Sequence, residues 1–166
     1  MIVLWRVSNH CNLACPFCAY DKRLALPREE ADPAQVARLI DLLGAWRSET
    51  GRPVLLSWLG GEPLLWAPRA ELDERAAGQG IRLSLTTNGT RLGAPRVRAE
   101  LVQRYSEVTI SIDGMGNFHN AMRGWRDAFE KLAQSVPALT GERDAVGAEL
   151  KVRANIVLMR DNKRYR

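Results

Sequence analysis

Short apolar runs alternate along the chain with longer segments whose apolar residues recur every three or four positions. The short runs are rich in β-branched residues, which favour strands, whereas the longer segments have the periodicity of amphipathic helices. The predicted strands are 2–7, 54–59, 81–85, 108–112 and 150–158. Continuous apolar strands separated by helices are typical of a parallel sheet covered on at least one face. The pattern therefore predicts an α/β protein.

The clearest predicted helix begins at Asp32 and Pro33, an N-cap residue followed by proline at the first helical position. Gly51 can end this helix in a left-handed conformation. Two shorter helices are predicted, one over 68–77 and one after Pro95. A fourth carries the apolar residues Trp125, Phe129, Leu132 and Val136, and 141–147 is predicted to be a surface connection.

The length of 166 residues suffices for one hydrophobic core, so we expect a single domain over 1–166. The net charge of +5 comes mostly from arginines spread along the chain, which does not indicate nucleic-acid binding. No apolar stretch approaches the ~20 residues that a membrane helix needs. The first residues do not resemble a signal peptide, and we expect a cytoplasmic protein with reduced thiols.

Polar or glycine-containing motifs follow each predicted strand directly. They are the cysteine segment 11–18, Gly60-Gly61-Glu62-Pro63, Thr86-Thr87-Asn88-Gly89-Thr90, Ser111-Ile112-Asp113-Gly114 and 160–162. Taken singly, most are ordinary turn signals. In parallel α/β folds, however, ligands bind at the carboxyl ends of the strands. We therefore expect these segments to meet at one site.

The cysteines of the chain are Cys11, Cys15 and Cys18. On a helix they would share one face as buried apolar residues, but Pro16 argues for a loop. A disulfide would leave one thiol over, and nothing in the sequence indicates export.

A metal centre fits the three cysteines better, in one of two forms. A structural zinc site needs four ligands, so His10 or His119 would have to complete it. Three thiolates can instead hold an iron–sulfur cluster with one position left open, and an open position suggests chemistry.

The residue types of the segment Gly60-Gly61-Glu62 suit ligand binding. Paired glycines allow left-handed dihedral angles and let a ligand approach the backbone closely, while Glu62 offers a carboxylate to a cation. The alternative is a tight turn with an exposed glutamate.

The spacing C-x3-C-x2-C, with Phe17 before the last cysteine, resembles the signature of the radical S-adenosylmethionine (radical SAM) enzymes. The Gly-Gly-Glu-Pro, Thr-Asn-Gly and Ser-Ile-Asp-Gly segments are similar to further motifs of this family, especially its peptide-modifying (SPASM-type) branch. The resemblance implies that the cysteines bind three irons of a [4Fe–4S] cluster and that S-adenosylmethionine chelates the fourth.

The resemblance also implies roles for other residues. Gly60, Gly61 and Glu62 would bind the amino group of S-adenosylmethionine, and Ser111 and Asp113 would lie near its carboxylate or ribose. Asn88 would form the floor of the site, and Arg123 would bind a carboxylate of cofactor or substrate. Arg153 and Asn155, two apart on the fifth strand, resemble positions that some members turn toward the cofactor.

The family implies a partial (β/α) barrel, and we expect this chain to be incomplete after its fifth strand, without a C-terminal auxiliary-cluster domain. The implied partners are a flavodoxin- or ferredoxin-type electron donor and a peptide substrate. An exposed fifth strand would also favour self-association or a partner that completes the barrel. The alternatives are a non-catalytic fragment that binds cluster and cofactor, and a zinc-binding structural domain.

Overall fold

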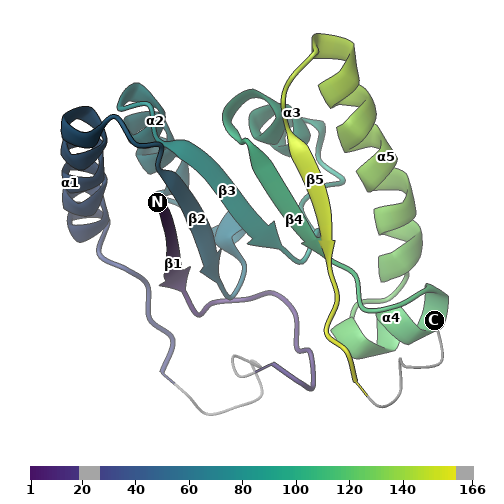
Figure 1. Ribbon diagram of the computed structural model, residues 1–166. Helices are drawn as coiled ribbons and strands as arrows, with labels where there is room; N and C mark the ends of the chain where they lie inside the picture. The colour runs from purple at the N-terminus through teal and green to yellow at the C-terminus, as the bar shows by residue number, and fades with distance from the viewer. Residues whose placement is uncertain (19–26, 160–166) are drawn as a thin grey trace.

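The computed structural model describes residues 1–18 and 27–159. Within them, five strands form one parallel sheet in the order β1-β2-β3-β4-β5 (Figure 1). The strands are β1 (Ile2–Ser8), β2 (Leu55–Gly60), β3 (Arg82–Thr87), β4 (Glu107–Ser111) and β5 (Lys151–Asn155). The α-helices are α1 (Pro33–Thr50), α2 (Arg69–Gly78), α3 (Pro95–Arg104), α4 (Gly116–Arg123) and α5 (Ala128–Val146), and a short 3-10 helix η1 covers Pro63–Leu65. The predicted α/β fold is confirmed.

The core lies between the sheet and the helices that cover one of its faces. Leu56 and Trp58 of β2 are fully buried there, as are Val36 and Ile40 of α1. The other face is open in the described part of the chain. It exposes Ile2 and Leu4 of β1 at 68% and 66% of their surface.

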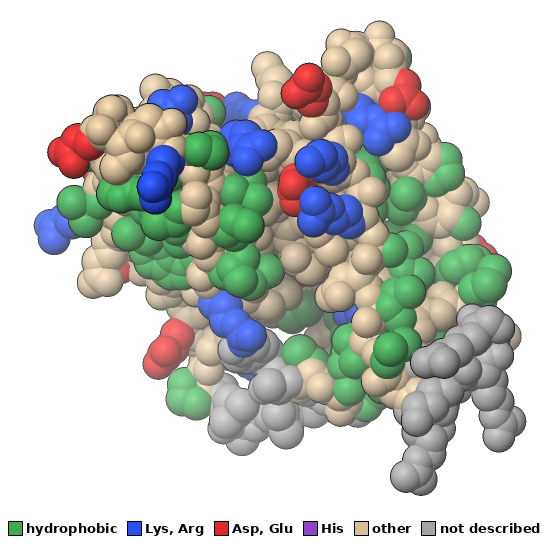
Figure 2. Space-filling model, in the orientation of Figure 1, with side chains coloured by type: hydrophobic (Ala, Val, Ile, Leu, Met, Phe, Trp, Pro, Cys, Tyr) green, Lys and Arg blue, Asp and Glu red, His purple; other side chains and the backbone are tan. Residues whose placement is uncertain are grey.

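Figure 2 shows this open face, with hydrophobic side chains over β1 and basic side chains near the start of β5. Lys151 and Arg153 of β5 both pair with Glu107 of β4. Most of β5 is exposed. The expected self-association stays a prediction.

Several predicted boundaries agree closely with the structure. The Asp32 carboxylate accepts a hydrogen bond from the Ala34 N–H at 3.0 Å, and Gly51 ends α1 with φ of 67°. The first four predicted strands differ from the observed ones by at most two residues at each end. The prediction of β5 over 150–158 was too long, because residues after Asn155 leave the sheet and Val157 N–H bonds to Asp113 instead.

The predicted fourth helix is confirmed as α5, which carries Phe129, Leu132 and Val136, but the placement of Trp125 in it was wrong. Two helices occur there, because Gly124 adopts φ of 59° and ends α4, and Trp125 lies in the turn before α5. The predicted connection over 141–147 was also wrong, since α5 continues through Gly141 to Val146. A glycine costs a helix only about 1 kcal/mol. Packing of buried Leu132 and Leu139 offsets that cost.

None of the helices in the described ranges combines the length and apolarity that crossing a membrane would require.

A buried polar network joins α2 to β2 and to the residue after α3. Asp73 accepts hydrogen bonds from Trp58 Nε1 at 2.7 Å, from Arg69 Nη1 at 2.6 Å and from the Tyr105 hydroxyl at 2.6 Å. Asp73 is fully buried, so these donors replace the water that its carboxylate would otherwise need.

We expect Asp73→Ala to lower the free energy of unfolding by about 3 kcal/mol, because three buried donors lose their acceptor. Urea unfolding followed by circular dichroism measures the change. Asp144→Ala, which removes an exposed partner of Arg143, is the matched control and should cost less than about 1 kcal/mol. Equal effects of the two substitutions would contradict this interpretation.

Candidate active site at the carboxyl ends of the strands

A cavity of about 390 Å³ lies where the strands end. Its lining includes nine of the predicted site residues: Cys11, Cys15, Cys18, Gly60, Gly61, Asn88, Ser111, Arg123 and Asn155. In Figure 1 the cysteine segment runs from the end of β1 across the ends of the strands toward α4. The structure therefore brings together the motifs that follow β1, β2, β3 and β4, with Asn155 at the end of β5. The predicted motif at 160–162 lies outside the described residues.

Backbone contacts with Gly60 and Gly61 anchor the chain that enters the cysteine segment. Gly61 N–H donates to Ser8 O at 2.7 Å, and Glu62 N–H donates to His10 O at 2.8 Å. A Cβ at Gly60 would collide with Ser8 O, and one at Gly61 would collide with His10 O. Of these two glycines, Gly60 is the one with a positive φ, of 139°. The glycines thus permit a close approach of the chain to itself, next to the cavity.

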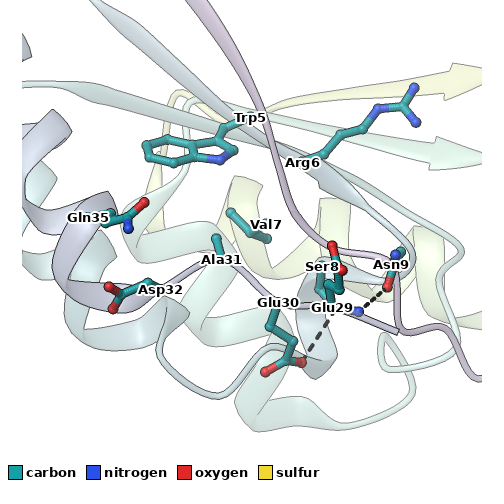
Figure 3. Close-up of a pocket in the computed structure, with 10 residues that line it drawn as sticks. All are labelled: Trp5, Arg6, Val7, Ser8, Asn9, Glu29, Glu30, Ala31, Asp32 and Gln35. Carbon is teal, nitrogen blue, oxygen red and sulfur yellow. Dashed lines mark hydrogen bonds between the residues drawn. The ribbon is translucent and has the colours of Figure 1, made fainter. Parts of the chain in front are cut away.

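The chain that leaves the cysteine segment is anchored to β1 as well. Ala31 N–H donates to Val7 O at 2.7 Å, and Glu29 N–H donates to Asn9 Oδ1 at 2.7 Å. Figure 3 shows this region, with a contact of 3.4 Å from Ser8 Oγ to Glu30. A second cavity, of about 360 Å³, lies here, and its lining contains none of the predicted site residues.

Cys11 contacts two N–H donors. Leu13 N–H lies 3.4 Å from its sulfur, and Asn88 Nδ2 lies 3.6 Å from it. Burial raises the pKa of the Cys11 thiol, and these donors oppose the shift. Asn88, which follows β3, therefore lines the cavity beside the first cysteine.

Cys15 lies beside the guanidinium of Arg123, with 3.9 Å between its sulfur and Nη1. Asp113 holds Arg123 through an ion pair of 2.6 Å, and the guanidinium lies 5.3 Å from the centre of the Phe17 ring. Burial raises the pKa of the Cys15 thiol, while the positive charge of Arg123 opposes this. Asp113 also accepts the Val157 N–H at 3.1 Å, which ties the chain after β5 to the site.

Glu62 is buried behind the cavity and does not line it. Its carboxylate accepts hydrogen bonds from Leu64 N–H at 3.1 Å, from Thr87 Oγ1 at 2.8 Å and from Asn88 N–H at 2.7 Å. Burial raises the pKa of Glu62, against the effect of these donors. The side chain joins the ends of β2 and β3, and its contact with a ligand cation stays a prediction.

Ser111 and Asn155 are register partners on β4 and β5, and both line the cavity. Arg153 points elsewhere, since it pairs at 3.1 Å with Glu107 at the opposite end of β4. His119 is fully buried, and its Nδ1 accepts the Asp113 N–H at 3.1 Å. Burial lowers the pKa of His119.

The donor set at the cavity fits an iron–sulfur cluster. Thiolates are the ligands that such clusters use, and each cysteine binds a different iron, so the sulfurs need not converge on one point. In the described part of the chain, no three His, Cys, Asp or Glu side chains are placed to hold a single metal ion.

Asn12, Thr87 and Thr90 belong to segments that the sequence predicts to meet at the site, but the sequence assigns none of the three a role of its own. Asn12 Nδ2 donates to Thr90 Oγ1 at 2.9 Å, and Thr87 Oγ1 donates to Glu62. In the sequence, only their positions point to these residues, since Asn12 follows a cysteine and the two threonines flank the predicted Asn88-Gly89 turn.

The geometry agrees with the outcome of comparison with known proteins. The family model described as the radical SAM superfamily matches residues 5–160, so the chain belongs to this superfamily. Its members are enzymes that use a [4Fe–4S] cluster and S-adenosylmethionine.

Particular relatives differ in what their names say they do. The chain is 32% identical to an AdoMet-dependent heme synthase of Oleidesulfovibrio alaskensis, over 99% of this chain and 40% of that protein. It is 31% identical to a PqqA peptide cyclase of Xanthomonas campestris, over 78% of this chain and 33% of that protein. The structure of Streptococcus suis SuiB shares the fold, with a TM-score of 0.66 and 23% identity over 96% of this chain and 33% of SuiB. The chain thus spans well under half the length of these proteins.

We expect Gly61→Ala to lower the iron bound per chain after anaerobic reconstitution, because a Cβ there pushes residues 8–10 away from β2. Iron and sulfide analysis measures the loss. The matched control is Gly141→Ala, where a Cβ has open space on α5, and this variant should load like the parent. Parental iron content in Gly61→Ala would show that the close approach is not required.

Proposed function

We propose that this chain is the core of a radical SAM enzyme, in which Cys11, Cys15 and Cys18 hold a [4Fe–4S] cluster with one iron open to S-adenosylmethionine. The observation that supports this is one cavity shared by the three thiols and by polar groups from the ends of β2, β3, β4 and β5. When bound and reduced, the cluster supplies the electron that cleaves S-adenosylmethionine to methionine and a 5′-deoxyadenosyl radical, which abstracts hydrogen from the substrate.

The residues around the cysteines suit a cofactor with an amino group and a carboxylate. Arg123 and Ser111 offer a cation and a hydroxyl to the carboxylate, and the Asp113 ion pair fixes the direction of the Arg123 guanidinium. Gly60 and Gly61 present backbone polar groups to the amino group, with the buried Glu62 behind them. Asn88 and Asn155 complete the polar lining.

For the substrate we propose a peptide. Two observations support this proposal. The Thr-Asn-Gly and Ser-Ile-Asp-Gly motifs resemble those of the peptide-modifying branch of the family, and the chain is similar to a peptide cyclase. The likeness to a heme synthase makes a tetrapyrrole the competing substrate class. A small electron-transfer protein of the flavodoxin or ferredoxin type would supply the electron.

Anaerobic reconstitution with iron and sulfide, followed by reduction and addition of S-adenosylmethionine, tests the proposal. We expect a brown protein that forms 5′-deoxyadenosine, detected by liquid chromatography. Cys15→Ala should lose both properties, because it removes one of three cluster ligands. A cluster without 5′-deoxyadenosine would instead support the non-catalytic alternative, and a colourless protein with stoichiometric zinc would support the structural one.

Arg123→Gln should weaken S-adenosylmethionine binding by about tenfold or more, because a charge-assisted hydrogen bond contributes about 1.5–3 kcal/mol. Equilibrium binding to the reconstituted protein measures the effect. Arg126→Gln removes a guanidinium that is 94% exposed and should bind like the parent. Unchanged affinity in Arg123→Gln would contradict the assigned role.

A further inference from the structure

A ring of side-chain hydrogen bonds joins the cysteine segment to the turn after β3. Asn88 Nδ2 donates to Asn12 Oδ1 at 2.9 Å, and Asn12 Nδ2 donates to Thr90 Oγ1 at 2.9 Å. The Thr90 hydroxyl closes the ring by donating to Asn88 Oδ1 at 2.7 Å. Each member of the ring thus has a defined donor and acceptor.

This ring fixes which way the Asn88 amide points. Asn88 Oδ1 accepts hydrogen bonds from both the N–H and the hydroxyl of Thr90, at 2.9 and 2.7 Å. Because its oxygen is held there, Nδ2 must face the opposite side, where Asn12 Oδ1 and the Cys11 sulfur lie. Asn88 is only 7% exposed, so water has little access to replace these partners.

An ordinary turn explains only part of this arrangement. An asparagine that accepts the N–H two residues on is a common Asx turn, and it needs no particular side chain at Thr90. The Thr90 hydroxyl and its bond from Asn12 are additional. These two additional hydrogen bonds restrict the orientation of the Asn88 amide beside Cys11. The backbone hydrogen bond from Thr90 N–H restricts that orientation less.

N–H donors to a cysteine sulfur affect the electronics of an attached cluster. One-electron reduction adds negative charge to cluster and ligands, and a nearby N–H dipole stabilises that charge, so hydrogen bonds to sulfur raise the reduction potential. The Asn88 amide is the one side-chain donor to Cys11 among the contacts of the described residues.

On the basis of the proposed function, we propose that Thr90 is a positioning residue: its hydroxyl orients the Asn88 amide so that Nδ2 donates to Cys11 and raises the reduction potential of the cluster. Asn12 takes part by accepting from Asn88 and donating to Thr90. Neither Asn12 nor Thr90 needs to touch the cofactor for this role.

Thr90→Val tests the proposal, because it keeps the shape and the backbone N–H but removes the hydroxyl. Without the hydroxyl, Asn12 Nδ2 loses its acceptor. The Asn88 amide can then rotate so that its oxygen and nitrogen exchange places, which removes the N–H donor from Cys11. We expect the midpoint potential, from a redox titration of the reconstituted protein followed by electron paramagnetic resonance without S-adenosylmethionine, to shift to a more negative value.

Two variants serve as comparisons for Thr90→Val. Thr90→Ser keeps the hydroxyl and should restore the parental potential. Thr140→Val makes the same change on α5, where the hydroxyl bonds Pro137 O at 3.0 Å, and should leave the potential unchanged. Asn88→Asp, which removes the donor at constant size, should also shift the potential downward and replaces Thr90→Val if that variant takes up no cluster.

Each outcome of these measurements either supports or overturns the proposed role of Thr90. Parental potentials in Thr90→Val or Asn88→Asp, or equal shifts in Thr90→Val and Thr90→Ser, would overturn the inference while leaving the proposed function intact. Loss of the cluster from both Thr90→Val and Asn88→Asp would also overturn it, since these side chains would then be needed for the protein to bind the cluster at all. A parent protein that takes up no cluster would overturn the proposed function, and this inference with it.

Discussion

Backbone hydrogen bonds between the end of β2 and the chain that enters the cysteine segment are the constraint on which the candidate site depends. Parallel pairing of β1 and β2 continues beyond the strands, through Ser8 and His10 on one side and Gly61 and Glu62 on the other. Residues 8–10 contact Gly60 and Gly61 of the same chain directly. This contact fixes the position, relative to the sheet, at which the cysteine segment begins. The side-chain contacts of Cys11 and Cys15 act on a segment that the backbone has already placed.

Charge is distributed unevenly around this segment. Cys11 lies near the buried carboxylate of Glu62 and receives neutral N–H donors, whereas Cys15 lies near the cation of Arg123. Asp113 balances part of that cation and ties it to β4. The sulfurs of Cys11 and Cys15 therefore meet different electrostatic surroundings, the first at the ends of β2 and β3 and the second at the end of α4.

Much of this could be predicted from local sequence. Apolar runs separated by helical periodicity were enough for the parallel sheet, and Asp32, Pro33 and Gly51 marked the ends of α1, because capping depends on neighbouring residues alone. Convergence of the motifs followed from topology. Helix α4 is not evident from the sequence because it is short and begins at Gly116, and the end of α5 is not evident because Gly141 interrupts the helical pattern. The inward orientation of Glu62 and the ring through Asn12 depend on partners 25 and 78 positions away, which no local pattern reveals.

The long sequence separation between Cys15 and Arg123 has a consequence for the order of events during synthesis. Their contact spans 108 positions, whereas Cys11 meets Asn88 across 77. A chain that emerges from the ribosome N-terminus first can complete the surroundings of Cys11 once β3 and its turn are out. Cys15 gains its cation only after β4 and α4 have followed. The surroundings of Cys15 therefore become available later along the chain than those of Cys11.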